Sequence, residues 1–458
     1  MKKNTNLDIL LINPWIYDFT AYDFWSKPLG LLYIASILRE QNYRINYIDC
    51  LDRYNSSILK LTRKKPLKKD EFGRGHFYKE EIDKPEILKS IPRRFNRYGI
   101  TEDIFLKEIK KIPRPRVILI TSIMTYWYPG VFRAIEMVKE LFPKTPVILG
   151  GVYSTLCYGH ASKLSGADYV IKGSNIKSLL QILEEITGNK GNNYSKYDKK
   201  LDYLPYPAWN LYEKLDYICI LSSRGCPFRC SYCASHKINP KLEFRNPIQV
   251  AEEIKYWSRR RKIKDFVFYD DALLIKPEDS FIVILNELIN KKVKIRLHMP
   301  NGIHARIINE EIAYKMYQSG VETIRLGFET VDPLVQETTG GKITNQEFKR
   351  AVNYLLKAGF KSSQIGAYLL IGLPGQKIQG IRDSIRFVVD CGAHPRLAKF
   401  SAIPGTKIWD QAKNYFEFHG EVDPLFHNDA LLPYISPDIT ERTYSKIKSI
   451  IKIQKEHV

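Results

Sequence analysis

The sequence predicts an α/β protein: an N-terminal Rossmann-like, doubly wound parallel sheet, a partial (β/α)6 barrel and a small C-terminal helical extension. Short apolar runs bounded by turn residues alternate with amphipathic stretches in both halves of the chain. A polar stretch without apolar periodicity, GNKGNNYSKYDKK, separates the halves as a linker would. At 458 residues the chain is also too long for one ordinary domain. We expect domains at 1–190 and 215–412, a linker at 191–214 and an extension at 413–458.

The first half is expected to form the doubly wound sheet. Its apolar runs predict strands at residues 7–12, 44–49, 116–121, 146–151 and 168–173. Amphipathic stretches between them predict helices at 29–41, 129–142 and 175–187. Short apolar strands separated by such helices are typical of a parallel sheet covered on both faces. A basic insertion at about 53–115 looks irregular and interrupts this pattern.

The second half repeats strand and helix six times. A first strand ends just before residue 222, and further strands are expected at 265–270, 294–299, 322–329, 364–372 and 396–403. The helix expected at 246–260 opens with Asn-Pro and places Val250, Ile254 and Trp257 on one face. Six such units predict a partial barrel, in which the chemistry lies at the carboxyl ends of the strands.

The last amphipathic stretch, 440–455, places Tyr444, Ile447, Ile450 and Ile451 on one face. We expect this helix to dock on the barrel, because an isolated amphipathic helix is marginal in water. Binding to a membrane surface is the alternative.

The net charge of +21 allows an anionic partner such as nucleic acid, but a lysine-rich solvated surface explains it equally well. The basic run at 258–264 ends an expected helix, where cations complement the helix dipole, so we do not favour nucleic acid. No apolar run has the length of a transmembrane segment or signal peptide. Of the seven cysteines, three are clustered and four are scattered, which does not indicate a disulfide framework. A cytoplasmic location is therefore expected.

Cys226, Cys230 and Cys233 have the spacing C-x-x-x-C-x-x-C. Structural zinc requires four ligands, and no fourth Cys or His follows at the spacing of a zinc finger or ribbon. A redox pair would use Cys230 and Cys233 and leave Cys226 unexplained. A 4Fe-4S cluster held by three cysteines leaves one iron open for another ligand. The spacing therefore favours a cluster, with zinc as the alternative.

The motif CPFRCSYC, just after the first expected barrel strand, resembles the signature of radical S-adenosylmethionine (radical SAM) enzymes. The resemblance implies that Cys226, Cys230 and Cys233 are the catalytic residues and metal ligands of a 4Fe-4S cluster whose open iron chelates SAM. It also implies an electron donor such as flavodoxin or ferredoxin, and cleavage of SAM to a 5′-deoxyadenosyl radical. Tyr232 would pack near the adenine.

Further segments resemble the same family at the expected strand ends. FYDDALL supplies Asp270 and Asp271 as candidates for holding the methionine end of SAM, and RLGFET supplies Arg325 and Glu329. Helix caps and a barrel ion pair are the structural alternatives for these residues. The usual GGE sequence does not follow the second strand.

The N-terminal half resembles the cobalamin-binding domain that precedes some of these barrels. No G-x-G-x-x-G follows the first strand, so a dinucleotide is not expected. The resemblance implies that Ser122, Gly150 and Gly151 line a slot for the nucleotide tail of cobalamin, and that Trp15 and Tyr17 face the corrin. The loop after the first strand contains no histidine, so we expect cobalt without a histidine ligand. A degenerate domain without a ligand is the alternative.

The resemblance covers most of the chain, from about 7 to 190 and from 215 to 412. It implies a cobalamin-dependent radical SAM enzyme that methylates an unactivated carbon of a substrate that no motif identifies. Three alternatives remain: an RNA-modifying radical SAM enzyme, a cyclisation or rearrangement without methylation, and a non-catalytic carrier or sensor.

Overall fold

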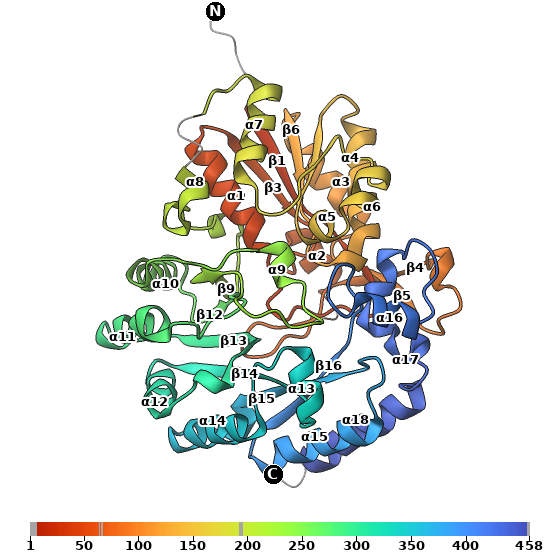
Figure 1. Ribbon diagram of the computed structural model, residues 1–458. Helices are drawn as coiled ribbons and strands as arrows, with labels where there is room; N and C mark the ends of the chain where they lie inside the picture. The colour runs from red at the N-terminus through yellow and green to blue at the C-terminus, as the bar shows by residue number, and fades with distance from the viewer. Residues whose placement is uncertain (1–6, 64, 66, 192–195, 456–458) are drawn as a thin grey trace, which may run out of the picture. The chain divides into compact units, whose positions relative to one another are not determined.

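The computed structural model describes residues 7–63, 65, 67–191 and 196–455 (Figure 1). The chain divides into two compact units, residues 1–215 and 216–458. Each unit is organised around a parallel sheet, which confirms the predicted α/β class. Among the described helices, none has both the length and the apolar character needed to cross a bilayer.

The sheet of the first unit has five parallel strands in the order β3-β1-β6-β7-β8. The strands are β1 (Asp8–Asn13), β3 (Arg44–Asp49), β6 (Val117–Ile120), β7 (Val147–Leu149) and β8 (Tyr169–Val170). All five coincide with expected strands, and several are shorter. Every residue of β1 is buried, as expected for the central strand of a sheet covered on both faces.

Helices cover both faces of this sheet. The helices are α1 (Leu29–Glu40), α3 (Glu102–Lys110), α4 (Tyr128–Leu141), α5 (Val152–Leu156), α6 (Tyr158–Leu164) and α7 (Ile176–Thr187). Leu10 and Ile12 of β1 face a core that includes Phe105 of α3 and Val138 of α4. The other face of β1 is covered by α1, which contacts both β1 and β3.

The insertion at 53–115 is structured, which corrects the expectation that it is irregular. It contains α2 (Ser56–Leu61), β4 (Lys79–Ile82), β5 (Phe95–Tyr98) and α3. The strand β5 pairs antiparallel with β4 on one side and with β2 (Ile16–Asp18) on the other. The segment after β1 therefore belongs to a second, three-stranded sheet instead of forming an open loop.

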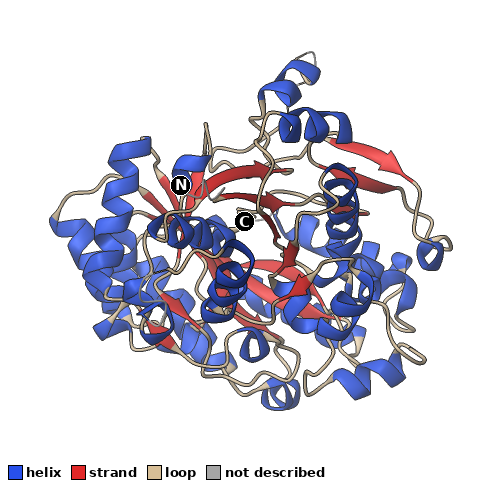
Figure 2. Cartoon of the chain, turned by 90° about the horizontal axis from the view of Figure 1, so that it is seen from above, coloured by secondary structure: helices blue, strands red, loops and turns tan. Residues whose placement is uncertain are grey.

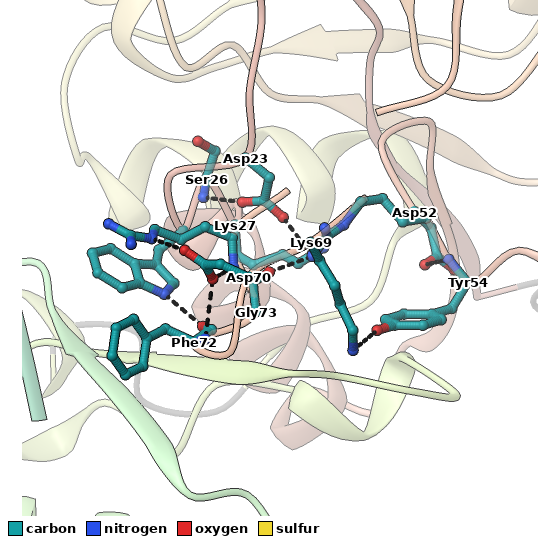
Figure 3. Close-up of polar contacts among 12 residues, drawn as sticks. Asp23, Ser26, Lys27, Asp52, Tyr54, Lys69, Asp70, Phe72 and Gly73 are labelled. Carbon is teal, nitrogen blue, oxygen red and sulfur yellow. Dashed lines mark hydrogen bonds and ion pairs between the residues drawn. The ribbon is translucent and has the colours of Figure 1, made fainter. Parts of the chain in front are cut away.

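A buried polar cluster joins the insertion to the segment after β1 (Figure 3). Arg53 forms an ion pair with Asp23 at 3.3 Å, and both side chains are less than a tenth exposed. Arg53 also donates to the carbonyl oxygen of Gly73 at 2.5 Å, and the indole of Trp25 donates to that of Phe72 at 3.0 Å. Because buried charges are costly unless paired, these contacts fix the insertion firmly.

The segment expected as a linker, 191–214, is largely packed on the first unit. It contains α8 (Lys196–Lys199), and its first part, residues 192–195, lies outside the described residues. Tyr197, Leu201 and Trp209 are at most 2% exposed. The backbone amide of Ala208 also donates to the carbonyl oxygen of Leu32 in α1 at 3.1 Å.

The second unit contains six parallel strands in sequential order, with β9 and β16 at the open edges. The strands are β9 (Tyr217–Ile220), β12 (Asp265–Phe268), β13 (Arg296–Ile303), β14 (Val321–Glu329), β15 (Ile365–Ile371) and β16 (His394–Lys399). Each strand pairs with the next one along the chain. This arrangement is the predicted partial barrel.

Helices alternate with these strands along the chain, and Figure 2 shows the helices in blue and the strands in red. The helices are α10 (Pro247–Arg261), α11 (Phe281–Asn290), α12 (Glu310–Gln318), α13 (Pro333–Thr339), α14 (Asn345–Lys357), α15 (Ile378–Asp390), α16 (Trp409–Tyr415), α17 (Leu432–Ile435) and α18 (Glu441–Lys455). The expected capping box of Thr344 and Glu347 starts α14. The terminal helix α18 buries Ile447 and contacts α15 and α17, as expected for a docked helix.

A buried polar triad lies at the amino-terminal side of the barrel strands, opposite their carboxyl ends. His298 contacts the Asp265 carboxylate through Nε2 at 2.9 Å and the Thr323 hydroxyl through Nδ1 at 3.1 Å. Arg296 adds two hydrogen bonds to Asp265, each at 2.7 Å. Burial raises the pKa of Asp265, but its bonds to His298 and Arg296 outweigh this and hold it below the usual value.

We expect Asp265→Asn to lower the thermal unfolding midpoint by about 5–10 °C at pH 7, because breaking a buried ion pair costs about 3–5 kcal/mol. Because the pKa of Asp265 is depressed in the folded state, its carboxylate stabilises the fold fully above the unfolded-state pKa of about 3.9. This stabilisation is lost as the pH falls through the folded-state pKa. The difference between variant and wild type should therefore shrink in acid. Thermal unfolding followed by circular dichroism measures the midpoints, and the exposed Asp390→Asn variant is the control. Equal midpoints for Asp265→Asn and wild type at pH 7 would contradict the prediction.

Candidate active site

Three cysteines lie on one short loop at the carboxyl end of β9. The loop follows β10 (Ser223–Arg224) and ends at α9 (Ser235–Ile238), and it carries Cys226, Cys230 and Cys233. None of the three forms a disulfide. The thiols are close enough to influence one another electrostatically. The structure thus carries the three predicted ligands on one loop, and their role as ligands stays a prediction.

The chemistry of these donors fits an iron-sulfur cluster. Burial raises the pKa of Cys226 to about 11 and also raises that of Cys230, so both thiols would have to release their protons on binding a metal. Within the described ranges, no three His, Cys, Asp or Glu side chains converge as ligands of a single metal ion. A four-iron cluster offers a separate iron to each thiolate, so three sulfurs distributed along one loop suit it better than zinc.

Two adjacent carboxylates after β12 hold the start of this loop. Asp270 is 2% exposed and accepts hydrogen bonds from the backbone amides and hydroxyls of Ser222 and Ser223. Asp271 accepts from the backbone amide of Gly225 at 3.2 Å. Burial raises the pKa of Asp270 against the opposing effect of these bonds. Both residues thus contact the cysteine loop. Their predicted contacts with SAM stay predictions.

The carboxyl end of β14 adds a charged pair. Glu329 has a backbone φ of 70°, which is uncommon for a residue with a side chain, and its Oε1 lies 2.5 Å from Nζ of Lys342. The same Nζ donates to the hydroxyl of Tyr232 at 3.0 Å. Arg325, the other candidate on this strand, donates instead to the carbonyl oxygen of Ile324. Lys342 is not among the site residues expected from the sequence, although it directly follows the Gly-Gly pair after α13.

An aromatic stack borders the cysteine loop. The ring of Phe228, between the first two cysteines, lies 4.1 Å from that of His304 at an interplanar angle of 29°. Burial, with the nearby cations Lys342 and Arg306, lowers the pKa of His304 to about 3. His304 is therefore neutral at physiological pH and stacks as an uncharged ring.

Gly340 packs directly against the cysteine loop. Its φ is 135°, and a Cβ atom added there would lie 3.0 Å from Cα and 3.2 Å from Sγ of Cys230. The amide of Ser231 also donates to the carbonyl oxygen of Thr339 at 3.1 Å. A side chain at position 340 would displace the loop that carries the second cysteine.

In the first unit, the three small residues predicted to line a slot lie together at the carboxyl edge of β6 and β7. The Ser122 hydroxyl donates to the carbonyl oxygen of Gly150 at 2.9 Å and accepts from the amide of Tyr153 at 3.1 Å. A Cβ on Gly151, whose φ is 102°, would lie 2.3 Å from the carbonyl oxygen of Ser122. Open α/β sheets bind ligands at this edge.

The two aromatic residues expected to face a corrin differ in their exposure. Trp15 is 1% exposed, its indole donates to the carbonyl oxygen of Ile100 at 2.6 Å, and its ring packs on Phe105. It therefore has no exposed face for a ligand, which differs from the expectation. Tyr17 is partly exposed, and burial raises its pKa against the opposing effect of Arg97.

Residues 220–388 match the family model described as the Radical SAM superfamily. The chain contains a radical SAM domain. Such a domain uses a 4Fe-4S cluster and SAM, and the cysteine loop lies within the matched residues. The enzyme is 22% identical to an uncharacterized methyltransferase from Pyrococcus horikoshii, over 69% of this chain and 73% of that protein.

Two further matches extend the comparison. The enzyme is 21% identical to the anaerobic magnesium-protoporphyrin IX monomethyl ester cyclase of Rubrivivax gelatinosus, over 72% of this chain and 65% of that protein. Its fold matches the radical SAM methyltransferase TsrM from Kitasatospora setae, solved with cobalamin and a 4Fe-4S cluster bound. That match has a TM-score of 0.65 at 14% identity and covers 93% of this chain and 82% of TsrM.

We expect Gly340→Ala to reduce the iron content of the reconstituted enzyme severalfold, because the added methyl group would displace Cys230. The matched control is Gly380→Ala in α15, where a Cβ meets no atom within 4 Å. Iron and acid-labile sulfide assays after anaerobic reconstitution measure the effect. Equal iron content in both variants would contradict the close packing of Gly340 on the loop.

Proposed function

We propose that the protein is a cobalamin-dependent radical SAM methyltransferase. The observation that carries the proposal is the loop of Cys226, Cys230 and Cys233 at the carboxyl edge of a partial barrel, in a chain whose first unit is a doubly wound sheet. The fold match to a methyltransferase that holds cobalamin and a cluster supports it. The substrate is a molecule with an unactivated carbon.

The three cysteines would hold three irons of the cluster and leave the fourth for SAM. When bound, the cluster and SAM supply a 5′-deoxyadenosyl radical, and methylcobalamin supplies the methyl group. The chain's own residues position these groups. Asp270 and Asp271 fix the loop, and the half-buried Tyr232 would pack beside the adenine. A one-electron donor such as flavodoxin or ferredoxin would reduce the cluster.

The polar groups of SAM would meet the charged side chains at the end of β14. Glu329 and Lys342 present opposite charges there, and the Glu329 carboxylate contacts the Lys342 ammonium group. Such a pair suits a zwitterionic ligand, because each of its charged groups finds a complementary partner. Arg325 lies earlier on the same strand.

The first unit would bind cobalamin at the edge where Ser122, Gly150 and Gly151 lie. Neither histidine of this unit lies in the segment directly after β1. The Nδ1 atom of His160 lies 2.6 Å from the hydroxyl of Tyr153, and His76 packs edge-on against Tyr22. The segment after β1 contains no histidine and is partly paired as strand β2, so we infer that cobalamin would be held without a histidine ligand.

Ring formation without methyl transfer is the second candidate, and the similarity to a monomethyl ester cyclase favours it. SAM carrying a deuterated methyl group separates the two. Methylation adds the labelled methyl group to the product, whereas cyclisation leaves the label in SAM or methionine. Both reactions require the same cluster.

We expect Cys230→Ala to abolish both the brown chromophore and the formation of 5′-deoxyadenosine, because two thiolates do not hold the cube. Wild-type protein reconstituted anaerobically should carry about four irons per chain. Iron assays and chromatography of SAM incubated with a strong reductant measure both effects. The control is Cys391→Ala, at the end of α15. Loss of iron and activity in the control but not in Cys230→Ala would refute the assigned ligands.

We expect the Co(II) form of protein-bound cobalamin to show no axial-nitrogen superhyperfine splitting in electron paramagnetic resonance spectra. His160→Ala and His76→Ala should leave the spectrum unchanged, because both histidines have other partners. Nitrogen splitting that disappears in either variant would contradict the histidine-free site. Failure of the protein to bind cobalamin would remove the methyl-transfer proposal.

A further inference from the structure

Lys342 is a buried cation next to the cysteine loop. Its side chain is 13% exposed, its Nζ atom lies 2.5 Å from the carboxylate of Glu329, and it donates to the hydroxyl of Tyr232 at 3.0 Å. Tyr232 lies between the second and third cysteines. The ammonium group also acts electrostatically on the thiols of Cys230 and Cys233.

The connection from β14 to α14 holds this lysine in position. Helix α13 begins at the cap Asp332 and ends at Gly340, which packs against Cys230. Arg306 donates to the carbonyl oxygen of Gly341 at 2.9 Å, so the glycine pair is held by a second contact as well. Lys342 follows directly, and its position is therefore set by the backbone on both sides.

Burying an ammonium group is unfavourable unless anions compensate it. Glu329 supplies one carboxylate in contact with Lys342. A cluster bound by three thiolates is anionic and gains a further negative charge when reduced, and charge and hydrogen bonding near a cluster set its reduction potential. A nearby cation stabilises the more negative, reduced form, and Coulomb attraction in a partly buried site is stronger than in water.

We propose that Lys342 is a positioning residue that raises the reduction potential of the cluster held by Cys226, Cys230 and Cys233, so that a one-electron donor can reduce it. One electron passes from the donor to the cluster, and no covalent bond of Lys342 changes. Glu329 moderates the effect with its opposite charge. The inference rests on the proposed cluster ligands.

The test is a redox titration of reconstituted protein without SAM, followed by the electron paramagnetic resonance signal of the reduced cluster. The decisive comparison is Glu329→Gln against Glu329→Gln with Lys342→Met, because removing the carboxylate from both prevents its protonation from masking the loss of the cation. At the midpoint of the single variant, the double variant should show an about tenfold lower ratio of reduced to oxidised cluster, or about 59 mV for one electron.

Further variants make the result specific. Lys342→Arg keeps the charge and should keep the wild-type potential, and Glu329→Gln should shift it upward. The control Lys291→Met removes a lysine that pairs with Glu252 and Glu287 on outer helices and should not move the potential. Equal potentials for the single and double Glu329 variants would overturn the proposal, as would a downward shift in Lys342→Arg equal to that of Lys342→Met.

Iron content and the spectrum of the wild-type protein are measured first. A wild-type protein without a reducible four-iron signal would refute the cluster assignment itself. A normal wild-type cluster whose potential does not respond to Lys342 would refute only the role of the lysine. If Lys342→Met alone loses iron, Lys342→Arg and Glu329→Gln still test the charge dependence, since both keep a cation at position 342.

Discussion

The carboxylate of Asp270 and the two serines at the end of β9 form the contact on which the candidate site depends. Four donors from Ser222 and Ser223 converge on one buried acid, so the chain must leave β9 in one direction. The cysteine loop begins three residues later, and Asp271 holds it again at Gly225. Without this anchor, three thiols on a short loop would have no fixed relation to the other strand ends. Strand pairing in sequential order then places the end of β14 within reach of the same loop.

Much of this arrangement was predictable because each barrel strand is a short apolar run that ends in polar residues. The positions of Cys226, Asp270 and Glu329 at carboxyl strand ends follow from that periodicity and from the rule that parallel strands align their ends. Lys342 was not predictable in this way. It lies beyond a helix and a glycine pair, and its contact with Glu329 depends on the fold of that connection. A Gly-Gly-Lys sequence in the connection after β14 was the one available signal.

In the first unit, hydrophobic periodicity alone is not enough to predict every helix and strand. Helix α3 carried visible signals, namely the cap Thr101 and acidic residues in its first turn, but it was obscured by its charged surroundings. Strands β4 and β5 are short and polar, and only pairing with β2 identifies them as strands. The same pairing explains Trp15. An aromatic residue after a strand suggests a ligand contact when the segment is taken as an open loop, but this segment continues as a second sheet and buries its tryptophan under α3.

The ion pair between Arg53 and Asp23 bears on how this domain can vary in evolution (Figure 3). Asp23 precedes the insertion, Arg53 lies at its start, and the carbonyl groups that complete the cluster come from its middle. Deleting the insertion would remove the ion-pair partner of a buried carboxylate and the acceptor of an aromatic donor, a loss that shortening an ordinary surface loop does not incur. The insertion is therefore not a detachable module. Homologous chains that lack it must also replace the acidic and aromatic residues after β1, so the two segments should be gained or lost together.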